Sequence, residues 1–338
     1  MATNVQFQKL LDAICQLSVK ILALRQFMQV HSDVNSLPVF QHAVVTIGTF
    51  DGVHLGHRQI IRQLKEEAAL IQGETVIITF HPHPRKIVRE GQSPVPILST
   101  LSEKIALLEA EGIDHLVVVP FDETFAAQTA AEYVQYFLVE KFHPYTVIIG
   151  YDHRFGKGRA GDYHLLEAYG LQLGFMVKEI PEHILDEVTI SSTRIREALL
   201  QTDIDTANHF LGYSYFFEGV VVKGNQLGRT IGFATANLQV EDAEKLIPGN
   251  GVYAVTVSLP GETFDGMMNI GLRPTVDGTK RVIEVHLFDF NRDIYGQTIK
   301  VAVQHYLRGE VKFSGLDALK EQLAKDKLAA SAILNRQS

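Results

Sequence analysis

The sequence predicts an α/β protein with two domains, an N-terminal doubly wound parallel sheet and a C-terminal small antiparallel β-barrel with a terminal helix. Three observations predict this fold class. The chain has 338 residues, which is long for one domain and ordinary for two. Its N-terminal half alternates short apolar strands with amphipathic helices. Its C-terminal part instead has short strands separated by Gly, Pro and Asn turns.

The N-terminal domain is expected at residues 28–205. β-branched or apolar runs of strand length predict strands at 43–47, 75–80, 115–119 and 146–150. Amphipathic patterns between them predict helices at 58–71, 102–111 and 130–141. This alternation indicates a parallel sheet covered by helices on both faces. Ligands in such folds bind beyond the carboxyl ends of the strands, so we expect the segments that follow three strands to share one rim: 48–57, 81–85 and 151–161.

The C-terminal domain is expected at residues 206–338. Strands are predicted at 216–223, 251–258, 266–270, 282–287 and 298–306, followed by one helix at 316–330. Short strands without intervening helices indicate a small antiparallel barrel. Residues 1–27 have helical periodicity but no chemistry, and a second methionine, Met28, begins the stretch that leads into the first strand. We therefore expect 1–27 to be a non-essential helical extension.

Composition and charge exclude several classes of function. The formal net charge of -8 argues against a protein that coats nucleic acid. The single cysteine, Cys15, excludes an intramolecular disulfide and a cysteine-based zinc site. No apolar run approaches the ~20 residues of a spanning helix, and no signal peptide is recognised. The sequence predicts a cytoplasmic monomer or weak homo-oligomer without a nucleic-acid or membrane partner.

The segment 48–57, GTFDGVHLGH, follows a predicted strand and opens a predicted helix. Glycines permit close approach of a ligand, and a helix N-terminus offers amides to phosphate. Two histidines three residues apart can donate to phosphate oxygens. The alternatives are that these two histidines are surface residues, or that they bind zinc with His81 or His83 as the third ligand. The segment predicts adenylyl transfer, with catalytic and phosphate-binding residues His54, His57, Gly48, Phe50, Asp51 and Gly56.

The segment 190–196, ISSTRIR, precedes another predicted helix. Ser192 and Thr193 can cap that helix and bind phosphate oxygens, while the guanidinium of Arg196 suits a polyphosphate. An ordinary capping run is the alternative. Together with the histidine loop, the segment predicts that Arg196 takes part in catalysis.

A second phosphate site is predicted in the barrel, where residues 224–238 read GNQLGRTIGFATANL. The residues expected to bind ATP phosphates are Gly224, Gly228, Arg229 and Gly232. Thr235 and Asn237 alternate onto one side of an extended chain and suit Mg²⁺ bound to ATP. Glu284, on the predicted strand at 282–287, is a candidate general base for a primary hydroxyl. The alternatives are that the glycine-rich loop is a simple turn and that Glu284 faces solvent.

The two adenylyl-transfer segments resemble the nucleotidyltransferase module of bacterial FAD synthetases, and so do the stretches TFHPHPR at 79–85 and GYDHRFG at 150–156. The segments at 224–238, 268–275, 283–290 and 306–313 resemble the riboflavin kinase module that follows it in that family. The resemblance covers roughly residues 28–330. It implies a Rossmann-like first domain, ATP and Mg²⁺ as partners of catalysis, and flavin-binding residues Arg85, Asp152, Phe155, Asn269 and Arg273.

This resemblance implies a bifunctional enzyme that phosphorylates riboflavin to FMN and adenylylates FMN to FAD, releasing pyrophosphate. Glu284 would activate the riboflavin 5′-hydroxyl, and Thr235 with Asn237 would bind Mg-ATP. The family usually has Phe at the position of His153 and Pro at the position of Ala234. A nucleotidyltransferase for a pantetheine phosphate or nicotinamide mononucleotide, and a flavin-binding regulator without catalysis, are the alternatives.

Overall fold

The structure is a computed structural model that describes residues 27–88, 95–180, 190–224, 228, 231–275 and 278–335. The expected extension at 1–27 lies almost wholly outside the described residues, and Arg229 also lies outside them. The chain divides into two compact units. The first, here called the sheet unit, comprises Met1–Thr49, Ile60–Pro82 and Ile105–Ile180; the second, the barrel unit, comprises Phe50–Gln59, His83–Lys104 and Pro181–Ser338.

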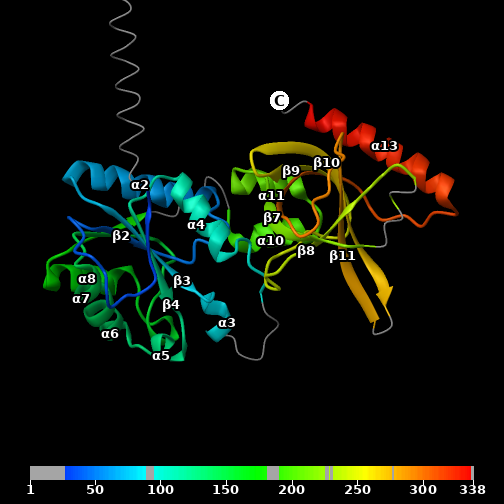
Figure 1. Ribbon diagram of the computed structural model, residues 1–338. Coiled ribbons are helices and arrows are strands. Elements are labelled where there is room, and N and C mark those ends of the chain that lie inside the picture. The colour runs from blue at the N-terminus through cyan, green and yellow to red at the C-terminus, as the bar shows by residue number, and fades with distance from the viewer. Residues whose placement is uncertain are drawn as a thin grey trace, which may run out of the picture. The chain divides into compact units, whose positions relative to one another are not determined.

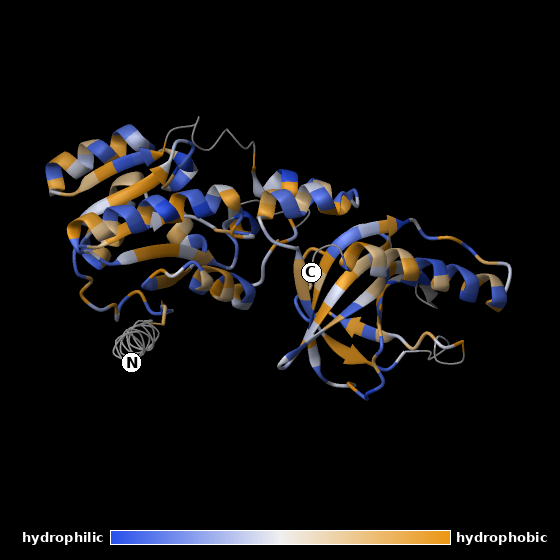
Figure 2. Ribbon diagram, turned by 90° about the horizontal axis from the view of Figure 1, so that it is seen from above, coloured by the Kyte–Doolittle hydropathy of each residue, from blue (hydrophilic) through white to orange (hydrophobic). Residues whose placement is uncertain are grey.

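The sheet unit contains a six-stranded parallel sheet in the order β1-β4-β3-β2-β5-β6. The strands are β1 (Gln29–His31), β2 (Val44–Ile47), β3 (Thr75–His81), β4 (His115–Pro120), β5 (Thr146–Gly150) and β6 (Met176–Ile180). The central strands are buried on both faces, as parallel strands under two layers of helices must be. Figure 2 shows these strands as largely hydrophobic. The predicted parallel sheet is confirmed.

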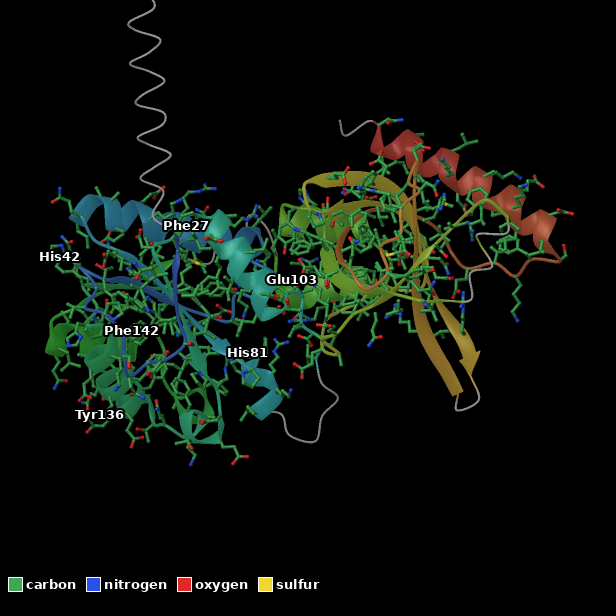
Figure 3. The ribbon with its side chains drawn as sticks, viewed as in Figure 1. Phe27, His42, His81, Glu103, Tyr136 and Phe142 are labelled. Carbon is green, nitrogen blue, oxygen red and sulfur yellow. The ribbon has the colours of Figure 1, made fainter. Side chains whose placement is uncertain are left out.

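Helices cover both faces of this sheet (Figure 1). The principal ones are α2 (Leu55–Ile71), α4 (Leu101–Ala110), α6 (Ala130–Glu132), η1 (Tyr133–Val139), α7 (Glu140–Phe142) and α8 (Tyr163–Leu173), with short α3 (Pro84–Val88), α5 (Glu123–Ala126) and η2 (Lys157–Arg159) between strands. The stretch predicted as one helix at 130–141 contains the π-helical η1. Buried and exposed faces are still separate along η1 and α7: Phe142 of α7 is buried within the unit, whereas Tyr136 of η1 is exposed (Figure 3).

The barrel unit contains a closed barrel in the order β10-β11-β8-β7-β12-β9. Its strands are β7 (Phe216–Val222), β8 (Ala236–Gln239), β9 (Gly251–Leu259), β10 (Glu262–Thr275), β11 (Gly278–Leu287) and β12 (Thr298–Arg308), and the adjoining helices are α10 (Ser192–Leu200), α11 (Ile204–Leu211) and α13 (Leu316–Leu334). All barrel pairings are antiparallel. The predicted barrel and terminal helix are confirmed.

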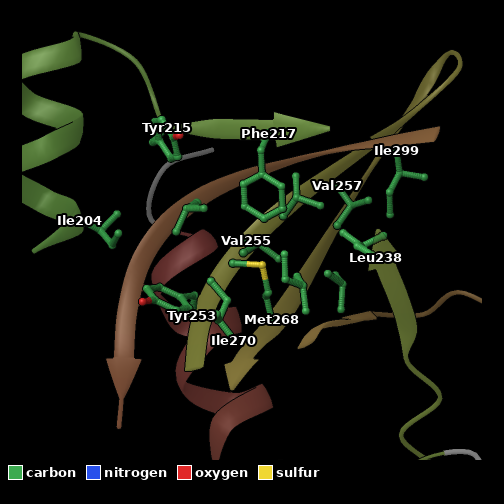
Figure 4. Close-up of a cluster of buried hydrophobic side chains, with 14 of the residues drawn as sticks. Ile204, Tyr215, Phe217, Leu238, Tyr253, Val255, Val257, Met268, Ile270 and Ile299 are labelled. Atoms are coloured by element: carbon green, nitrogen blue, oxygen red, sulfur yellow. The ribbon is translucent and has the colours of Figure 1, made fainter. Parts of the chain in front are cut away.

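Inward-facing side chains fill the barrel (Figure 4), among them Phe217, Val255, Val257, Met268 and Ile270. Apolar residues of α10 and α11 belong to the same buried cluster. The helix that follows the ISSTRIR segment is therefore packed with the barrel core. Alternation of buried and partly exposed residues along β12 shows the period of two expected for a strand with one face in a core.

Three strands were not predicted from the sequence, each for a local reason. β1 and β8 have only three and four residues, too few to show a period. β6 carries Lys178 and Glu179 and lies at the edge of the sheet, where strands need not be apolar.

In the part of the chain that the structure describes, no helix is long and apolar enough to cross a membrane.

Candidate active sites

The segments predicted to share one rim follow neighbouring strands of the sheet. β3, β2 and β5 are neighbours and run parallel, so Gly48, Pro82 and Tyr151, which directly follow them, lie along the same edge. The backbone N–H of Gly48 donates to the carbonyl of Ile78 at 3.0 Å. The sheet therefore fixes the point at which the histidine loop departs.

Asp51 anchors that loop within the barrel unit. Its side chain is buried and accepts hydrogen bonds from the backbone amides of Leu98, at 2.9 Å, and Ser99, at 3.0 Å. Arg196 Nη2 lies 2.5 Å from its other oxygen. Because these donors already occupy the carboxylate of Asp51, it is not available for contact with a phosphate ligand. The structure thus places Asp51 as the residue that holds the loop and Arg196 together.

The loop turns sharply at Gly52. Its φ of +82° lies in the left-handed region, and an added Cβ would lie 2.9 Å from Cδ1 of Leu98. The backbone N–H of Gly52 donates to Ser99 Oγ at 3.0 Å, and its carbonyl accepts from the hydroxyl of Tyr213 at 2.6 Å. Glycine is required here because any side chain would be strained and would push against Leu98. The ring of Phe50, which precedes this turn, is buried against His57.

His54 and His57 lie side by side where α2 begins, their rings stacked with centroids 3.7 Å apart. The backbone N–H of His57 donates to His54 Nδ1 at 3.4 Å, so neutral His54 carries its proton on Nε2. Burial lowers the pKa of His54 to about 4. Burial, then the charges of His54 and Lys104, hold the pKa of His57 well below its usual range. Both imidazoles are therefore neutral donors near pH 7.

The lowered pKa of His54 predicts a loss of stability in acid. Its pKa is about 4 in the folded chain against an ordinary 6.5, so between these values the unfolded chain binds more protons. Its stabilising contribution is complete above pH 6.5 and is lost as the pH falls toward 4. We expect His54→Gln to reduce the difference in unfolding free energy between pH 7 and pH 5 by about 2 kcal/mol. Urea denaturation at both pH values measures it.

Exposed His209 supplies the matched control, because His209→Gln should leave that pH dependence unchanged. A His54→Gln variant that kept the full wild-type pH dependence would show that burial of His54 does not set it.

Arg196 emerges from α10 beside the loop and is buried. Its Nε donates to the carbonyl of Pro96 at 2.7 Å, and its Nη2 bonds Asp51. Nη1 of Arg196 and Nδ1 of His57 are buried atoms without a hydrogen-bond partner among the described residues. A buried polar nitrogen without a partner is costly, and both nitrogens would gain one from an anionic ligand.

The ISSTRIR segment caps α10 differently from the prediction. The N-cap is Ser191, whose Oγ accepts from the amide of Arg194 at 3.3 Å; Ser192 and Thr193 are the first residues of the helix. Ser192 instead donates through Oγ to the carbonyl of Asp51 at 3.1 Å. Thr193 is exposed. The capping role predicted for Ser192 and Thr193 was wrong, because Ser191 already occupies the extended N-cap position. The prediction that a helix begins at this segment was correct.

Lys104 of α4 belongs to this cluster and was missed from the sequence. It is buried, and burial lowers its pKa to about 8, opposed by the charge of Asp51. Its charge also acts on His57 and His83. A lysine in an amphipathic helix looks like any surface lysine, so no sequence signal marked it.

The remaining predicted residues of this site take varied positions. Gly56 lies in the first turn of α2, and Arg85 lies on the exposed side of the short helix α3. Asp152 is exposed in the turn after β5. Phe155 is instead buried in the core, stacked on Tyr133 with ring centroids 5.1 Å apart. Among the described residues, no three His, Cys, Asp or Glu side chains are grouped to hold a metal ion, so the zinc alternative gains no support.

The second site is a cavity of about 240 Å³ in the barrel unit. It brings together five predicted residues from three segments of the sequence: Gly228, Thr235, Asn269, Arg273 and Glu284. Apolar and aromatic side chains line most of the rest of it, including Val252, Met267, Phe313, Leu319 and Leu323, and His286, Arg308 and Glu310 also line it. The strands β9, β10, β11 and β12, the glycine loop and the C-terminal helix α13 all contribute to this one cavity.

Strand register explains how the polar residues meet. Glu284 of β11 pairs with Asn237 of β8 on one side and with Asn269 of β10 on the other. Paired residues project from the same face of a sheet, so the carboxylate lies between two amides. Arg273 Nη2 lies 2.8 Å from Glu284 Oε2. Val285 and Leu287, on the opposite face, are buried in the core, so the side chains of β11 alternate between the cavity and the core.

The glycine loop fits closely around Asn237. A Cβ added to Gly224 would lie 2.2 Å from Asn237 Nδ2, so only glycine leaves room for that amide. Asn237 is buried, whereas Thr235 is partly exposed where it lines the cavity. Gly232 lies in an exposed turn with a φ of +84°. The structure thus brings Gly228 and Thr235 to the cavity and places Gly224 and Gly232 at its supporting turns.

Comparison with known proteins finds relatives of both parts of the chain. A family profile described as FAD synthetase matches residues 37–194, and one described as Riboflavin kinase matches residues 211–334. A crystal structure described as a macrolide-efflux protein from Streptococcus pneumoniae matches with a TM-score of 0.81 and 30% identity, covering 90% of this chain and 99% of that one.

Curated relatives match along nearly their whole length. A bifunctional riboflavin kinase/FMN adenylyltransferase of Haemophilus influenzae is 41% identical over 302 residues, covering 89% of this chain and 97% of the relative. Proteins of the same description from Escherichia coli K12 and Bacillus subtilis are 40% and 36% identical, each covering 85% of this chain and 91% of the relative. With both sites and both family matches in the same order, the chain belongs to the family of bifunctional riboflavin kinases/FMN adenylyltransferases.

Proposed function

We propose that this chain converts riboflavin to FAD in two reactions with ATP, one at each of the sites described above. The barrel carries the riboflavin kinase, and the N-terminal part carries the FMN adenylyltransferase. The observation that carries this assignment is the position of Glu284, held between two asparagines in a cavity beside the glycine loop. ATP is the co-substrate of both reactions.

In the kinase reaction, the 5′-hydroxyl of riboflavin attacks the γ-phosphorus of ATP and yields FMN and ADP. We propose that the carboxylate of Glu284 accepts the hydroxyl proton as the new O–P bond forms. Arg273, whose Nη2 lies 2.8 Å from Glu284 Oε2, keeps that carboxylate oriented. The apolar walls of the cavity suit the flavin ring, and Asn269 and Arg273 offer it polar contacts.

Mg²⁺ is proposed as the metal of the kinase site. The donors present fit it, because Thr235 and Asn237 offer the hydroxyl and amide oxygens that hard cations prefer, and the missing Cβ of Gly224 leaves space around that amide. These two residues would hold the ion. Bound there with ATP, it would neutralise charge on the β- and γ-phosphates. The backbone around Gly228, and Arg229, are proposed to contact those phosphates.

In the adenylyl transfer, a phosphate oxygen of FMN attacks the α-phosphorus of ATP and releases pyrophosphate. We propose that His54, His57 and Arg196 donate hydrogen bonds to the charge that develops on the phosphate oxygens. The unpartnered buried nitrogens of His57 and Arg196 support this role. The N-terminus of α10, at Ser192 and Thr193, adds backbone amides and the positive end of the helix dipole.

Further assignments for the adenylyl site follow from the resemblance of the loops. Arg85 and Asp152 are proposed to bind FMN, with Phe155 supporting the loop from within the core. The net charge of -8 and the single cysteine support a cytoplasmic enzyme that binds neither nucleic acid nor membranes. We propose that it acts as a monomer or weak homo-oligomer.

The direct test is to incubate the protein with riboflavin, Mg²⁺ and ATP and to separate the flavins by chromatography. We expect FMN to appear first and FAD to follow, with pyrophosphate released. Omission of Mg²⁺ should stop both steps. Accumulation of FMN without FAD would contradict the transferase assignment, and unchanged riboflavin would contradict the kinase assignment.

A further inference from the structure

His286 lies in the kinase cavity but has no part in the chemistry proposed above. Its Nδ1 lies 2.7 Å from the carbonyl oxygen of Ala234. A carbonyl only accepts hydrogen bonds, so Nδ1 must carry the proton in this contact. His286 is two residues from Glu284 on β11 and projects from the same face of that strand. The imidazole therefore spans from the strand of the proposed base to the glycine loop.

Two aromatic rings hold this imidazole in place. Its ring centroid lies 5.3 Å from that of Phe233 and 5.7 Å from that of Phe288. Phe288 is buried. Burial lowers the pKa of His286, so the ring is neutral near pH 7, with one proton to donate. A donor fixed by packing loses little freedom when it forms its bond.

Among the described residues, the ladder between β8 and β11 does not reach the segment that His286 holds. The β8–β11 ladder ends at the pair Ala236–Val285, so Ala234 and Thr235 lie just beyond the last ladder pair. Ala234 also lacks the ring that would fix φ if proline stood there. The bond from His286 extends the connection between the two strands past the end of the ladder. Its target is the carbonyl of the residue immediately before Thr235.

We propose that His286 is a positioning residue of the kinase, whose Nδ1–H holds the backbone at Ala234 and so presents the Thr235 hydroxyl to Mg-ATP. This inference rests on the proposed kinase function of the barrel. Because the effect is transmitted through the glycine loop, it falls on Mg-ATP and leaves riboflavin binding unchanged.

The test compares His286→Leu with His286→Asn, which retains an N–H donor close to the position of Nδ1. The summed rate of FMN and FAD formation from riboflavin is measured over a range of Mg-ATP and riboflavin concentrations. We expect His286→Leu to raise the KM for Mg-ATP about three- to tenfold and leave the KM for riboflavin within about twofold. His286→Asn should recover most of that loss. His305→Leu, which removes a histidine of β12 that pairs with Asp205, is the matched control and should change neither KM.

Several results would overturn the inference. One is a KM for Mg-ATP unchanged in His286→Leu, and another is an equal rise in both KM values. A His286→Asn variant no better than His286→Leu would also refute the donor role. ¹⁵N NMR of ring-labelled histidine gives a readout independent of activity: a proton on Nδ1 of His286 is expected, and a proton on Nε2 alone would refute the bond. If the wild-type protein makes no FMN, the proposed kinase function fails instead.

Discussion

Replacing Glu284 by Gln should lower FMN formation from riboflavin about 10²- to 10⁴-fold, because the amide cannot accept the proton of the 5′-hydroxyl. Glutamine retains the shape of the side chain and an oxygen that can accept from Arg273, whose Nη2 lies 2.8 Å from the carboxylate. The neighbouring amides of Asn237 and Asn269 keep their places in the ladder. The variant should therefore fold normally while losing the kinase step.

The two reactions are measured separately. Riboflavin with ATP reports the kinase, whereas FMN with ATP reports the adenylyltransferase, and the second rate should stay within about twofold of wild type. Glu262→Gln is the control, since it neutralises a glutamate of the same barrel that is exposed and paired with Arg292. A Glu284→Gln variant that phosphorylated riboflavin at the wild-type rate would rule out Glu284 as the base.

Replacing His57 by Ala should have the reverse effect. We expect conversion of FMN to FAD to fall about 10²- to 10³-fold, the size of effect seen when one positioned donor to a developing oxyanion is removed. Nδ1 of His57 is buried without a hydrogen-bond partner among the described residues, so a phosphate oxygen is the acceptor we assign to it. FMN should therefore accumulate when the variant is given riboflavin and ATP.

The control is His209→Ala, which removes an exposed histidine of α11 from the same unit. Thermal denaturation should accompany the assay, because the ring of His57 packs against His54 and Phe50. Equal damage to FMN formation and to FAD formation would contradict two separate active sites.

Much of the fold followed from local patterns. Strand-length runs of Val and Ile, such as 75–80, and helical spacing between them are visible in any short window of the chain. The loop from Gly48 to His57 was also visible, because its glycines and histidines are contiguous. β6 was missed since an edge strand with Lys178 and Glu179 carries no apolar run.

Pairings between distant residues were not visible in this way. Asp51 and Arg196 are separated by 145 positions, and the sequence presented both as phosphate-site residues. In the structure they form a buried pair that holds the loop, because a buried carboxylate must be matched by donors wherever the chain supplies them. Likewise, Phe155 looked like a flavin contact from its motif, yet its ring completes the core against Tyr133.

By itself, the sequence determined the two kinds of domain, the histidine loop, the glycine loop and their order, since periodicity and contiguous motifs are local properties. Only the tertiary structure decided which side chains meet. The register of β8, β11 and β10 placed Glu284 between two asparagines, and the end of the β8–β11 ladder gave His286 the carbonyl of Ala234. Register and ladder length depend on how the whole barrel buries its apolar faces, which no short segment encodes.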